Sequence, residues 1–358
     1  MNMQNHQSNA ATSPASKPIA LDEALRMLVR GQDLFREQAS SLLDGLLDSQ
    51  TSDLQIAELL TALARKGETS EELTGMAAAM RARMIPLDCN FPNVIDTAGT
   101  GASKVKTFNV STAAAFVIAA AGLPIAKHGA KAATSNSGSA DVLHELGIDV
   151  QAEPSVSARS LAEHRICFLF APQYHPAAAR VAPVRRQLGF RTVFNLIGPL
   201  SSPSRARHQV LGVSDSSLQS KMAEALANLG CVRGWVIHGE DGLDEISLAA
   251  PTRVIEIRNG GRDSFTVSPE TFGLRAADCA HLRAESAEAS ARQTLSVLNN
   301  TADRCATDLV ILNAAAALAV GLDLDPRAAA DLARSVIVDG TALAKLETVR
   351  SFRKEQTA

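Results

Sequence analysis

Two short loops in this chain of 358 residues contain the residue types that bind phosphate. The first loop contains Gly99-Thr100-Gly101 and leads to Asn109, Ser111 and Thr112 at the start of a predicted helix. Glycine lets the backbone approach a ligand closely, and the free N–H groups at a helix start favour an anion. The alternative is that Ser111 or Thr112 only caps the helix.

The second loop follows a predicted strand. Lys127-His128-Gly129 stands at the end of that strand, and Ser135 to Ser139, followed by Asp141, opens the next helix. Ligands of open α/β sheets bind at the carboxyl ends of the strands, so Lys127 could neutralise a phosphate or pyrophosphate there. The alternative is a solvated lysine beside a structural histidine.

An acidic turn runs from Gly239 to Glu245, again directly after a predicted strand. Mg²⁺ prefers a few carboxylates together with water and phosphate oxygens. Asp244 and Glu245 suit that role, whereas Glu240 and Asp241 are interpreted as turn residues. Without the phosphate loops, a solvated acidic turn would be the preferred interpretation.

The segment from Tyr174 to Leu188 reads as a helix interrupted at Pro183 and carries three arginines. Arginine forms bidentate pairs with carboxylates, so Arg180, Arg185 or Arg186 could bind one. We expect at most one of them to be buried and functional, and the others to be solvated.

The elements that must position these loops alternate between strand and helix from Val94 onward. Strands are predicted at 124–128, 166–171, 209–213, 235–238 and 254–257. Helices are predicted at 111–121, 139–146, 157–163, 176–188 and 218–229, and again at 307–320, 326–338 and 341–352. This alternation is typical of a largely parallel sheet with helices on its faces.

The segment before this alternation contains helices only. Ser52-x-x-Gln55 and Thr69-x-x-Glu72 are capping-box patterns that open apolar-periodic runs. We therefore expect a disordered extension at 1–18, a helical domain at 19–90 completed by part of 173–192, and an α/β domain at 91–357. The fold class is α/β, with a small all-helical domain hinged to the larger domain and its mostly parallel sheet.

Composition excludes several function classes. The hydrophobic content of 46% indicates a globular protein, and a net charge of −3 with 4% aromatic residues disfavours a nucleic-acid partner. The polar N-terminus and the short apolar run at 113–121 predict no membrane association and a cytoplasmic location. Buried free thiols are expected at Cys89, Cys167, Cys231, Cys279 and Cys305.

Together these segments resemble the anthranilate phosphoribosyltransferase family, over about residues 21–352. The motifs follow in the family's order: GTG with FNVST, KHG with SGSAD, FLFAPQYHP, VRRQLGFRTVFNLIGPL and VIHGEDGLDEIS. The resemblance implies transfer of phosphoribose from 5-phosphoribosyl 1-pyrophosphate to the amino group of anthranilate, in tryptophan biosynthesis. It also implies a homodimer of the two-domain fold described above.

The resemblance implies a role for each matching residue. The donor would be held by Gly99, Thr100, Gly101, Thr107, Asn109, Ser111, Thr112, Lys127 and Ser139. The acceptor would contact Gly99, His128 and Arg185, with Arg185 facing the anthranilate carboxylate. Mg²⁺ would be held by Ser111, Asp244 and Glu245.

Both phosphate loops depart from the family's pattern. Ala102-Ser103 replaces the Gly-Asp of GTGGD, Ala130-Lys131 replaces the Asn-Arg of KHGNR, and Asn136 replaces a basic residue. Because the changes cluster while the framework is kept, we favour retained binding with altered donor or acceptor contacts. A phosphoribosyltransferase for another aromatic acceptor and a non-catalytic paralogue stay open, whereas the Asp244-Glu245 pair argues against a nucleoside phosphorylase.

Overall fold

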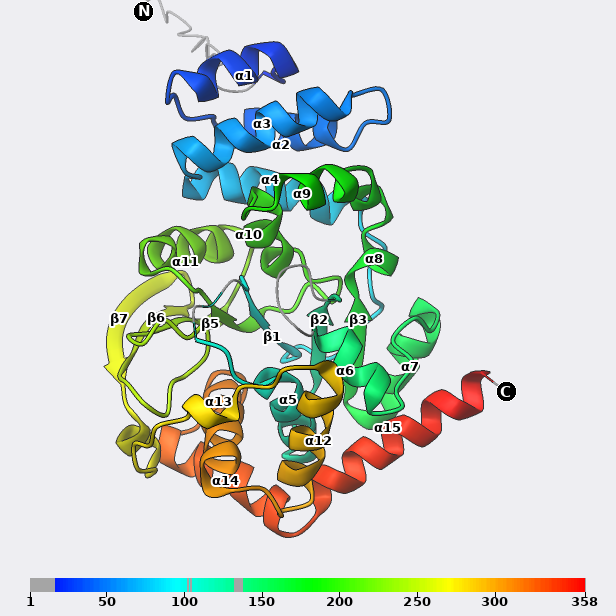
Figure 1. The fold of residues 1–358 in the computed structure, drawn as a ribbon, viewed down its shortest axis with the longest axis vertical. Helices are drawn as coiled ribbons and strands as arrows, with labels where there is room; N and C mark the ends of the chain where they lie inside the picture. The colour runs from blue at the N-terminus through cyan, green and yellow to red at the C-terminus, as the bar shows by residue number, and fades with distance from the viewer. Residues whose placement is uncertain (1–16, 102, 104, 132–137, 358) are drawn as a thin grey trace, which may run out of the picture.

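The chain folds into a layer of helices stacked on a seven-stranded sheet that is covered on both faces (Figure 1). This computed structural model describes residues 17–101, 103, 105–131 and 138–357, with side chains up to residue 352. Ala102, Asn136, the serines at 135 and 137, and most of the extension predicted at 1–18 lie outside the described residues. The fold class expected from the sequence is confirmed.

The helical layer is built from four helices near the N-terminus: α1 (Leu21–Val29), α2 (Arg36–Leu46), α3 (Asp53–Lys66) and α4 (Ser70–Arg83). Both predicted capping boxes are present. The N–H of Gln55 donates to Ser52 Oγ at 3.3 Å, and the N–H of Glu72 donates to Thr69 Oγ1 at 3.2 Å. These caps satisfy donors that a helix start leaves unpaired, which explains why α3 and α4 begin there.

The sheet has the strand order β3-β2-β1-β4-β5-β6-β7. The first five strands in this order pair in parallel, and β6 pairs antiparallel with both of its neighbours, β5 and β7. The chain order reverses between β1 and β4, which are hydrogen-bonded neighbours. Such a reversal opens a crevice at the carboxyl ends of the strands. The strands are β1 (Ile95–Gly99), β2 (Ile125–Gly129), β3 (Ile166–Phe170), β4 (His208–Gly212), β5 (Arg233–Gly239), β6 (Thr252–Arg258) and β7 (Gly261–Val267).

The five predicted strands are confirmed to within two residues at each end. The sequence indicated β1 only through the turn expected at Gly99, and it did not indicate β7. Six of the seven residues of β7 are exposed, so this edge strand lacks the buried apolar pattern on which strand prediction depends.

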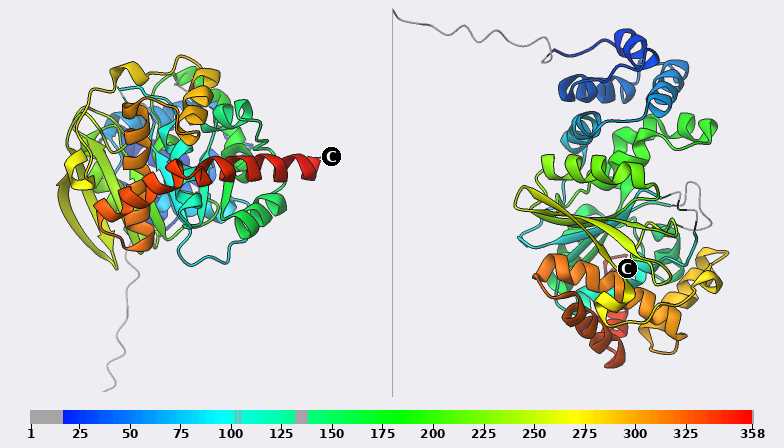
Figure 2. Two further views of the ribbon diagram at one scale, coloured as in Figure 1. Left: turned by 90° about the horizontal axis from the view of Figure 1, so that it is seen from below. Right: turned by 90° about the vertical axis from the view of Figure 1, so that its left-hand side faces the viewer.

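One face of the sheet is covered by helices that lie below the strands in Figure 1 and in the right view of Figure 2. They are α5 (Val110–Ala120), α6 (Ser139–Glu145), α12 (Ala287–Leu298), α13 (Arg304–Leu322), α14 (Pro326–Val338) and α15 (Thr341–Thr357). Helix α7 (Pro154–His164) packs beside the edge strand β3, and its Leu161 belongs to a separate cluster with Cys167 and Leu169. Helix α13 is long and apolar enough to cross a membrane, but 78% of its apolar window is buried inside the protein. It therefore serves here as a core helix.

The other face is covered by α10 (Val193–Leu200) and α11 (Gln219–Asn228), which lie between the sheet and the helical layer (Figure 2, right). The chain reaches them through α8 (Ala171–Tyr174), a 3-10 turn at Pro176–Arg180, and α9 (Ala182–Leu188). The prediction of one helix interrupted at Pro183 is wrong. The break is at Val181, and Pro183 lies in the first turn of α9, where its missing N–H has no intrahelical partner to lose.

Two hydrophobic cores lie on opposite faces of the sheet because side chains alternate along the strands. Val210 and Trp235 are paired across β4 and β5 and point to the core around α5 and α13. The next pair, Leu211 and Val236, points to the core that α10 and α11 share with α3 and α4. Helix α9 also packs against α3. The domain boundaries given above, with the helical domain completed by part of 173–192, stay predictions.

Candidate functional site

A cavity of about 760 Å³ opens at the carboxyl ends of β1, β2, β4 and β5. Gly99, Gly129 and Gly212 end three of these strands, and all three line the cavity. Met80 of α4 and residues of α9 and α10 also line it, so the helical layer contributes to its wall. The cavity therefore lies where the strand order reverses, the position expected for a ligand in an open α/β sheet.

The structure brings together twelve of the thirteen site residues that the sequence singled out. The residues that line the cavity are Gly99, Thr100, Gly101, Thr107, Asn109, Ser111, Lys127, His128, Ser139, Arg185, Asp244 and Glu245. Thr112 is the exception, because its side chain is fully buried and does not line the cavity. The two predicted phosphate loops and the acidic turn thus share one cavity.

The acidic corner of the cavity joins the start of α5 to the turn after β5. The N–H of Ser111 donates to Glu245 Oε1 at 3.2 Å. Among the described residues, none hydrogen-bonds the buried Oε2 of Glu245, and Asp244 lies beside Glu245 in the chain. Burial, followed by the charge of Asp244, raises the pKa of Glu245 to about 8. A cation bound at this corner would relieve both the repulsion and the unpaired oxygen.

Two glycines make room for neighbouring polar groups. A Cβ at Gly99 would lie 2.8 Å from Asp244 Oδ2, and a Cβ at Gly129 would lie 2.1 Å from Ser139 Oγ. Both distances are shorter than real contacts of a Cβ, so any side chain would displace these groups. The glycines therefore let the acidic turn and the serine approach the strand ends closely.

Lys127 occupies the centre of the site and is buried. Its Nζ donates to the backbone carbonyl of Thr97 at 2.5 Å, and the carboxylates of Asp96 and Glu245 act electrostatically on it. Burial lowers the pKa of Lys127, while those two carboxylates counteract the shift. Asp96 in turn accepts the N–H of His128 at 3.1 Å, which fixes the end of β2.

The opposite end of the cavity is lined by two histidines and an arginine. The rings of His128 and His175 lie 5.1 Å apart, and burial lowers their pKa values to about 3 and about 4 respectively. Both are therefore neutral near pH 7. Arg185 lies over the ring of Phe194 at 5.1 Å and donates to Asn195 Oδ1 at 3.4 Å.

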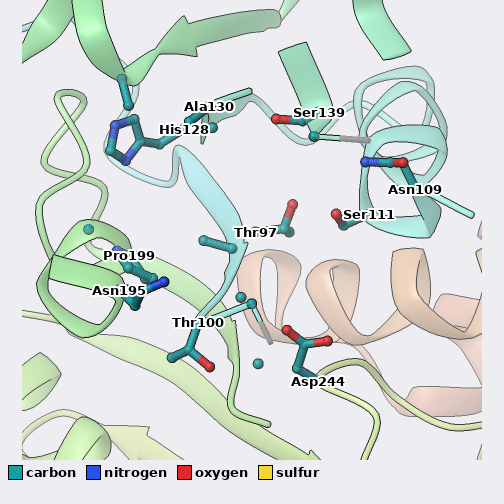
Figure 3. Close-up of a pocket in the computed structure, with 18 of the residues that line it drawn as sticks. Thr97, Thr100, Asn109, Ser111, His128, Ala130, Ser139, Asn195, Pro199 and Asp244 are labelled. Carbon is teal, nitrogen blue, oxygen red and sulfur yellow. The ribbon is translucent and has the colours of Figure 1, made fainter. Parts of the chain in front are cut away.

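Figure 3 shows that these groups form two ends of one site. His128, Asn195 and Pro199 lie on one side of Thr97, and Asn109, Ser111 and Asp244 lie on the other. One end thus presents acids and a helix start, whereas the other presents an arginine, neutral imidazoles and an amide. This arrangement fits a charged phosphorylated ligand beside a smaller polar one.

Arg180 and Arg186, the other two arginines of the segment from Tyr174 to Leu188, do not line the cavity. Arg180 pairs with Asp53 of α3 at 2.7 Å, and Arg186 is exposed. Arg185 is therefore the one arginine of this segment that lines the cavity, in line with the expectation of at most one functional arginine.

The departures in the loops can be described at three positions. The hydroxyl oxygen of Ser103 lies 2.8 Å from the carbonyl oxygens of both Val105 and Gly242, and its one hydrogen can be donated to either, so it links the first loop to the acidic turn. Ala130 and Lys131 both line the cavity beyond Gly129. Ser103 thus has a structural partner, whereas Ala130 offers the site no side-chain hydrogen bond.

The cavity is also lined by residues that were not singled out from the sequence, among them Met80, Thr97, His175 and Asn195. His175 and Asn195 lie within motifs that were recognised, FLFAPQYHP and FNLIGPL, so their polar side chains were a usable signal. Met80 reads as an ordinary core residue of an amphipathic helix. Only the packing of α4 over the cavity reveals its position.

Two family models match the chain. The model described as the α/β domain of a glycosyl transferase family matches residues 91–343, and the model of its helical bundle domain matches residues 22–84. The two matches leave residues 85–90 between them.

Curated relatives share this length and arrangement. An anthranilate phosphoribosyltransferase of Halalkalibacterium halodurans is 40% identical over 334 residues, covering 93% of this chain and 98% of the relative. One of Thermomicrobium roseum is 44% identical over 336 residues, covering 92% and 96%.

Solved structures show the same fold. Anthranilate phosphoribosyltransferase of Thermus thermophilus superposes with a TM-score of 0.87 at 38% identity, covering 92% of this chain and 99% of that one. The Saccharomyces cerevisiae enzyme, solved with phosphoribosyl pyrophosphate (PRPP) and Mg, superposes with a TM-score of 0.85 at 27% identity, covering 94% and 98%.

Proposed function

This chain belongs to the anthranilate phosphoribosyltransferase family, and we propose that it transfers phosphoribose from 5-phosphoribosyl 1-pyrophosphate to the amino group of anthranilate. The products would be N-(5-phosphoribosyl)anthranilate and pyrophosphate. The observation that carries the proposal is the single cavity in which an acidic corner and a helix start face an arginine and two neutral histidines.

The donor would bind at the end of the cavity formed by α5 and the first loop. Gly99, Gly101 and Asn109 present backbone and amide groups there, and the N-terminus of α5 favours the negative phosphates. Thr100, Thr107, Ser111 and Ser139 supply hydroxyls that line the same wall. Thr112 contributes through the packing of α5 rather than through a donor contact, since it does not line the cavity.

The acidic corner is suited to hold Mg²⁺. Two carboxylates and the hydroxyl of Ser111 are the hard oxygen ligands that this ion prefers, and no described residue hydrogen-bonds the buried Oε2 of Glu245. When bound, Mg²⁺ would supply positive charge against the pyrophosphate group. Gly99 would let Asp244 approach the donor closely, because no side chain stands between them.

The acceptor would lie between Arg185, His128 and Gly99. Arginine can bind a carboxylate through two parallel hydrogen bonds, and burial strengthens such a pair. The Nε2 of His128 is buried and none of the described residues pairs with it, so it can accept a hydrogen bond from the amino group of the acceptor. With a pKa of about 3, it would orient the amine rather than remove its proton in advance.

Positioning and electrostatics would then drive the reaction. Lys127 would stabilise the negative charge that develops on the departing pyrophosphate, and the cation-like ribose carbon would be attacked by the nearby amine. Met80 of α4 lines the cavity, so the helical layer covers part of it. This cover would help to exclude water that could hydrolyse the donor. A hinge motion of the helical layer would open the site for exchange.

The direct test follows the loss of anthranilate fluorescence on incubation with 5-phosphoribosyl 1-pyrophosphate and Mg²⁺. We expect turnover that depends on both the donor and the ion. Donor binding by calorimetry without turnover would instead favour a different aromatic acceptor. If neither the donor nor Mg²⁺-pyrophosphate binds, the proposed activity is wrong.

A second candidate is a phosphoribosyltransferase for another aromatic acceptor. It is favoured by Ala130, which lines the cavity at the position where the family's pattern has an asparagine, and by His175, a buried imidazole that also lines the cavity. This imidazole could hydrogen-bond a substituent that anthranilate lacks. A screen of substituted aminobenzoates with the same donor would separate the two candidates.

We also propose a cytoplasmic homodimer. The supporting observation is that three large hydrophobic side chains of the helical layer are exposed: Val29 at 72%, Phe35 at 54% and Leu54 at 68%. Burying such groups against a second copy would remove apolar surface from water. Light scattering coupled to size-exclusion chromatography would give the mass, and a monomer at micromolar concentration would contradict the proposal.

A further inference from the structure

A cluster of soft and hard metal ligands lies away from the cavity, between a 3-10 turn and the start of α13. His281 belongs to the turn at Ala280–Leu282, while Asp303 and Cys305 flank the first residue of α13. One possible ligand atom of each residue lies within 4.8 Å of the others, and His281 Nε2 lies 3.6 Å from Asp303 Oδ1. Two chain segments about twenty residues apart thus converge on one point.

A second thiol lies beside this cluster. Cys279 precedes His281 by two residues and is partly buried, as is Cys305. Cys305, Asp278, Asp303 and Asp241 are close enough to act electrostatically on the thiol of Cys279. Two thiols and several carboxylates therefore lie together here, and the carboxylate charges would favour a divalent cation.

The residue types define the kind of cation. We propose that Cys305, His281 and Asp303 bind a thiophilic divalent ion of the Zn²⁺ type; Cys279, whose thiol lies outside this group, would complete the site by rotation of its side chain. Cysteine, histidine and aspartate are the usual ligands of Zn²⁺, which takes four of them in a tetrahedron. In such a site the ligand atoms lie roughly 3.3–3.8 Å apart, by the usual Zn–N, Zn–O and Zn–S bond lengths. Exposed side chains can close the remaining distance by rotation, because His281 and Asp303 are both more than half exposed.

Asp303 can cap helix α13 and bind the ion at the same time. Asp303 Oδ1 accepts the N–H of Ala306 at 3.0 Å, and a carboxylate has a second oxygen with free lone pairs. The ion would therefore cross-link the turn to an already formed helix start. Mg²⁺ is a poor alternative, since it favours oxygen ligands and not thiolates.

The cross-link would stabilise two segments that reach the main cavity. Arg283 and Ala284 follow the turn directly and line the cavity. Asn313, further along α13, also lines it and accepts the N–H of Ile246, the residue after Glu245, at 2.8 Å. The ion would thus have a structural role, holding the turn against α13 outside the reaction centre.

Cobalt titration of the full-length protein tests the site. The protein is stripped with a chelator, reduced with a phosphine and saturated with Mg²⁺, after which Co²⁺ is added. We expect a thiolate-to-cobalt charge-transfer band that saturates at one equivalent and is abolished by Zn²⁺. Asp244 and Glu245 cannot produce this band, because no cysteine of the described residues lines the main cavity.

Matched variants assign the ligands. Cys305→Ser and His281→Ala should lose the band or weaken Co²⁺ binding by about tenfold or more, as for other losses of metal-site groups. Cys89→Ser, which changes another partly buried thiol, should leave the band unchanged. Cys279→Ser should reduce the band intensity, and full intensity in that variant would overturn the place of Cys279.

Thermal unfolding gives an independent readout. Zn²⁺ should raise the melting temperature of the parent protein and leave that of Cys305→Ser unchanged, because only a bound ion stabilises the folded state. Equal melting temperatures of the two proteins without metal would show that the variant is folded. A missing band, a band that persists in Cys305→Ser, or uptake without saturation would overturn the proposal.

Discussion

Ser111 donates its backbone N–H to Glu245 Oε1 at 3.2 Å, which joins residues 134 positions apart in the chain. The start of α5 and the acidic turn are therefore one unit, and a phosphate bound by the helix would lie beside both carboxylates. The same hydrogen bond gives the buried carboxylate of Glu245 a polar partner.

Glu245→Gln tests the charge at this corner. The amide keeps the size of the side chain but cannot supply a negative ligand, so Mg²⁺-dependent turnover should fall by about a hundredfold, the effect of losing one group that organises transition-state charge. Glu240→Gln, in the same turn but paired with Arg253 on the surface at 3.2 Å, should change turnover little. Comparable activities of the two variants would contradict the assignment.

Gly99→Ala tests the close approach of the acidic turn to β1. The added Cβ would lie 2.8 Å from Asp244 Oδ2, so the carboxylate must move and the KM for the donor should rise severalfold. Gly261→Ala is the control, because its Cβ would meet only Arg258 O at the ordinary distance of 3.4 Å. Steady-state kinetics with varied donor concentration would measure both, and an unaltered KM in Gly99→Ala would refute this role.

Ala130→Asn tests the altered second loop. If the missing amide weakens acceptor binding, the variant should gain about 1 kcal/mol, or roughly fivefold in kcat/KM for anthranilate. Ala130→Leu is the matched control, since leucine has nearly the size of asparagine without its hydrogen-bonding groups. A gain in both variants, or in neither, would count against a lost hydrogen bond.

His175 should make the protein less stable in acid. Its pKa is about 4 in the folded state and near 6.5 when unfolded, so the unfolded state binds more protons between these values. Stability is complete above about pH 6.5 and is lost as the pH falls toward 4, by on the order of 3 kcal/mol from this group. Urea unfolding at several pH values, followed by the fluorescence of Trp235, would measure the slope.

The control for this prediction is His175→Gln, which cannot take up a proton. Its free energy of unfolding should decline less between pH 6.5 and 4.5 than that of the parent. Parallel curves for the parent and His175→Gln would show that another group is responsible.

Arg81 connects α4 to the ends of two helices below it. Its Nε donates to Leu200 O at 2.7 Å and its Nη1 to Leu229 O at 2.9 Å, and both carbonyls are at helix C-termini. Arg81→Met should leave these buried acceptors unpaired and cost about 2–4 kcal/mol in the free energy of unfolding. Arg83→Met, which removes only a half-exposed pair with Asp44, should cost less than about 1 kcal/mol by the same urea titration.

Most of the fold could be predicted from local pattern. Five strands were identified because each is a short run rich in apolar residues between turn residues, and α3 and α4 because capping boxes mark their starts. Strand β7 could not be found this way, because its stability comes from pairing with β6 rather than from buried side chains of its own. The break at Val181 was misplaced because proline interrupts a helix only beyond its first turn.

The site was predicted less completely, for a physical reason. Glycine, lysine and acid motifs mark chemistry at strand ends, so the two loops and the acidic turn could be placed at one edge. The sequence does not specify which helix covers that edge. Met80 and Asn195 reach the cavity only through the packing of α4 and α10, and Thr112 faces the protein interior although its neighbour Ser111 faces the cavity.

The hydrophobic cluster shared by α3, α4, α10 and α11 limits how this protein can be recombined with its relatives. The boundary near residue 90 looks like a natural cut, yet a chimera joined there would pair side chains of two origins across the cluster. An exchange that also carries residues 173–229 would keep the matching surfaces together. The residues that must be exchanged together with the helical layer are thus discontinuous in the sequence.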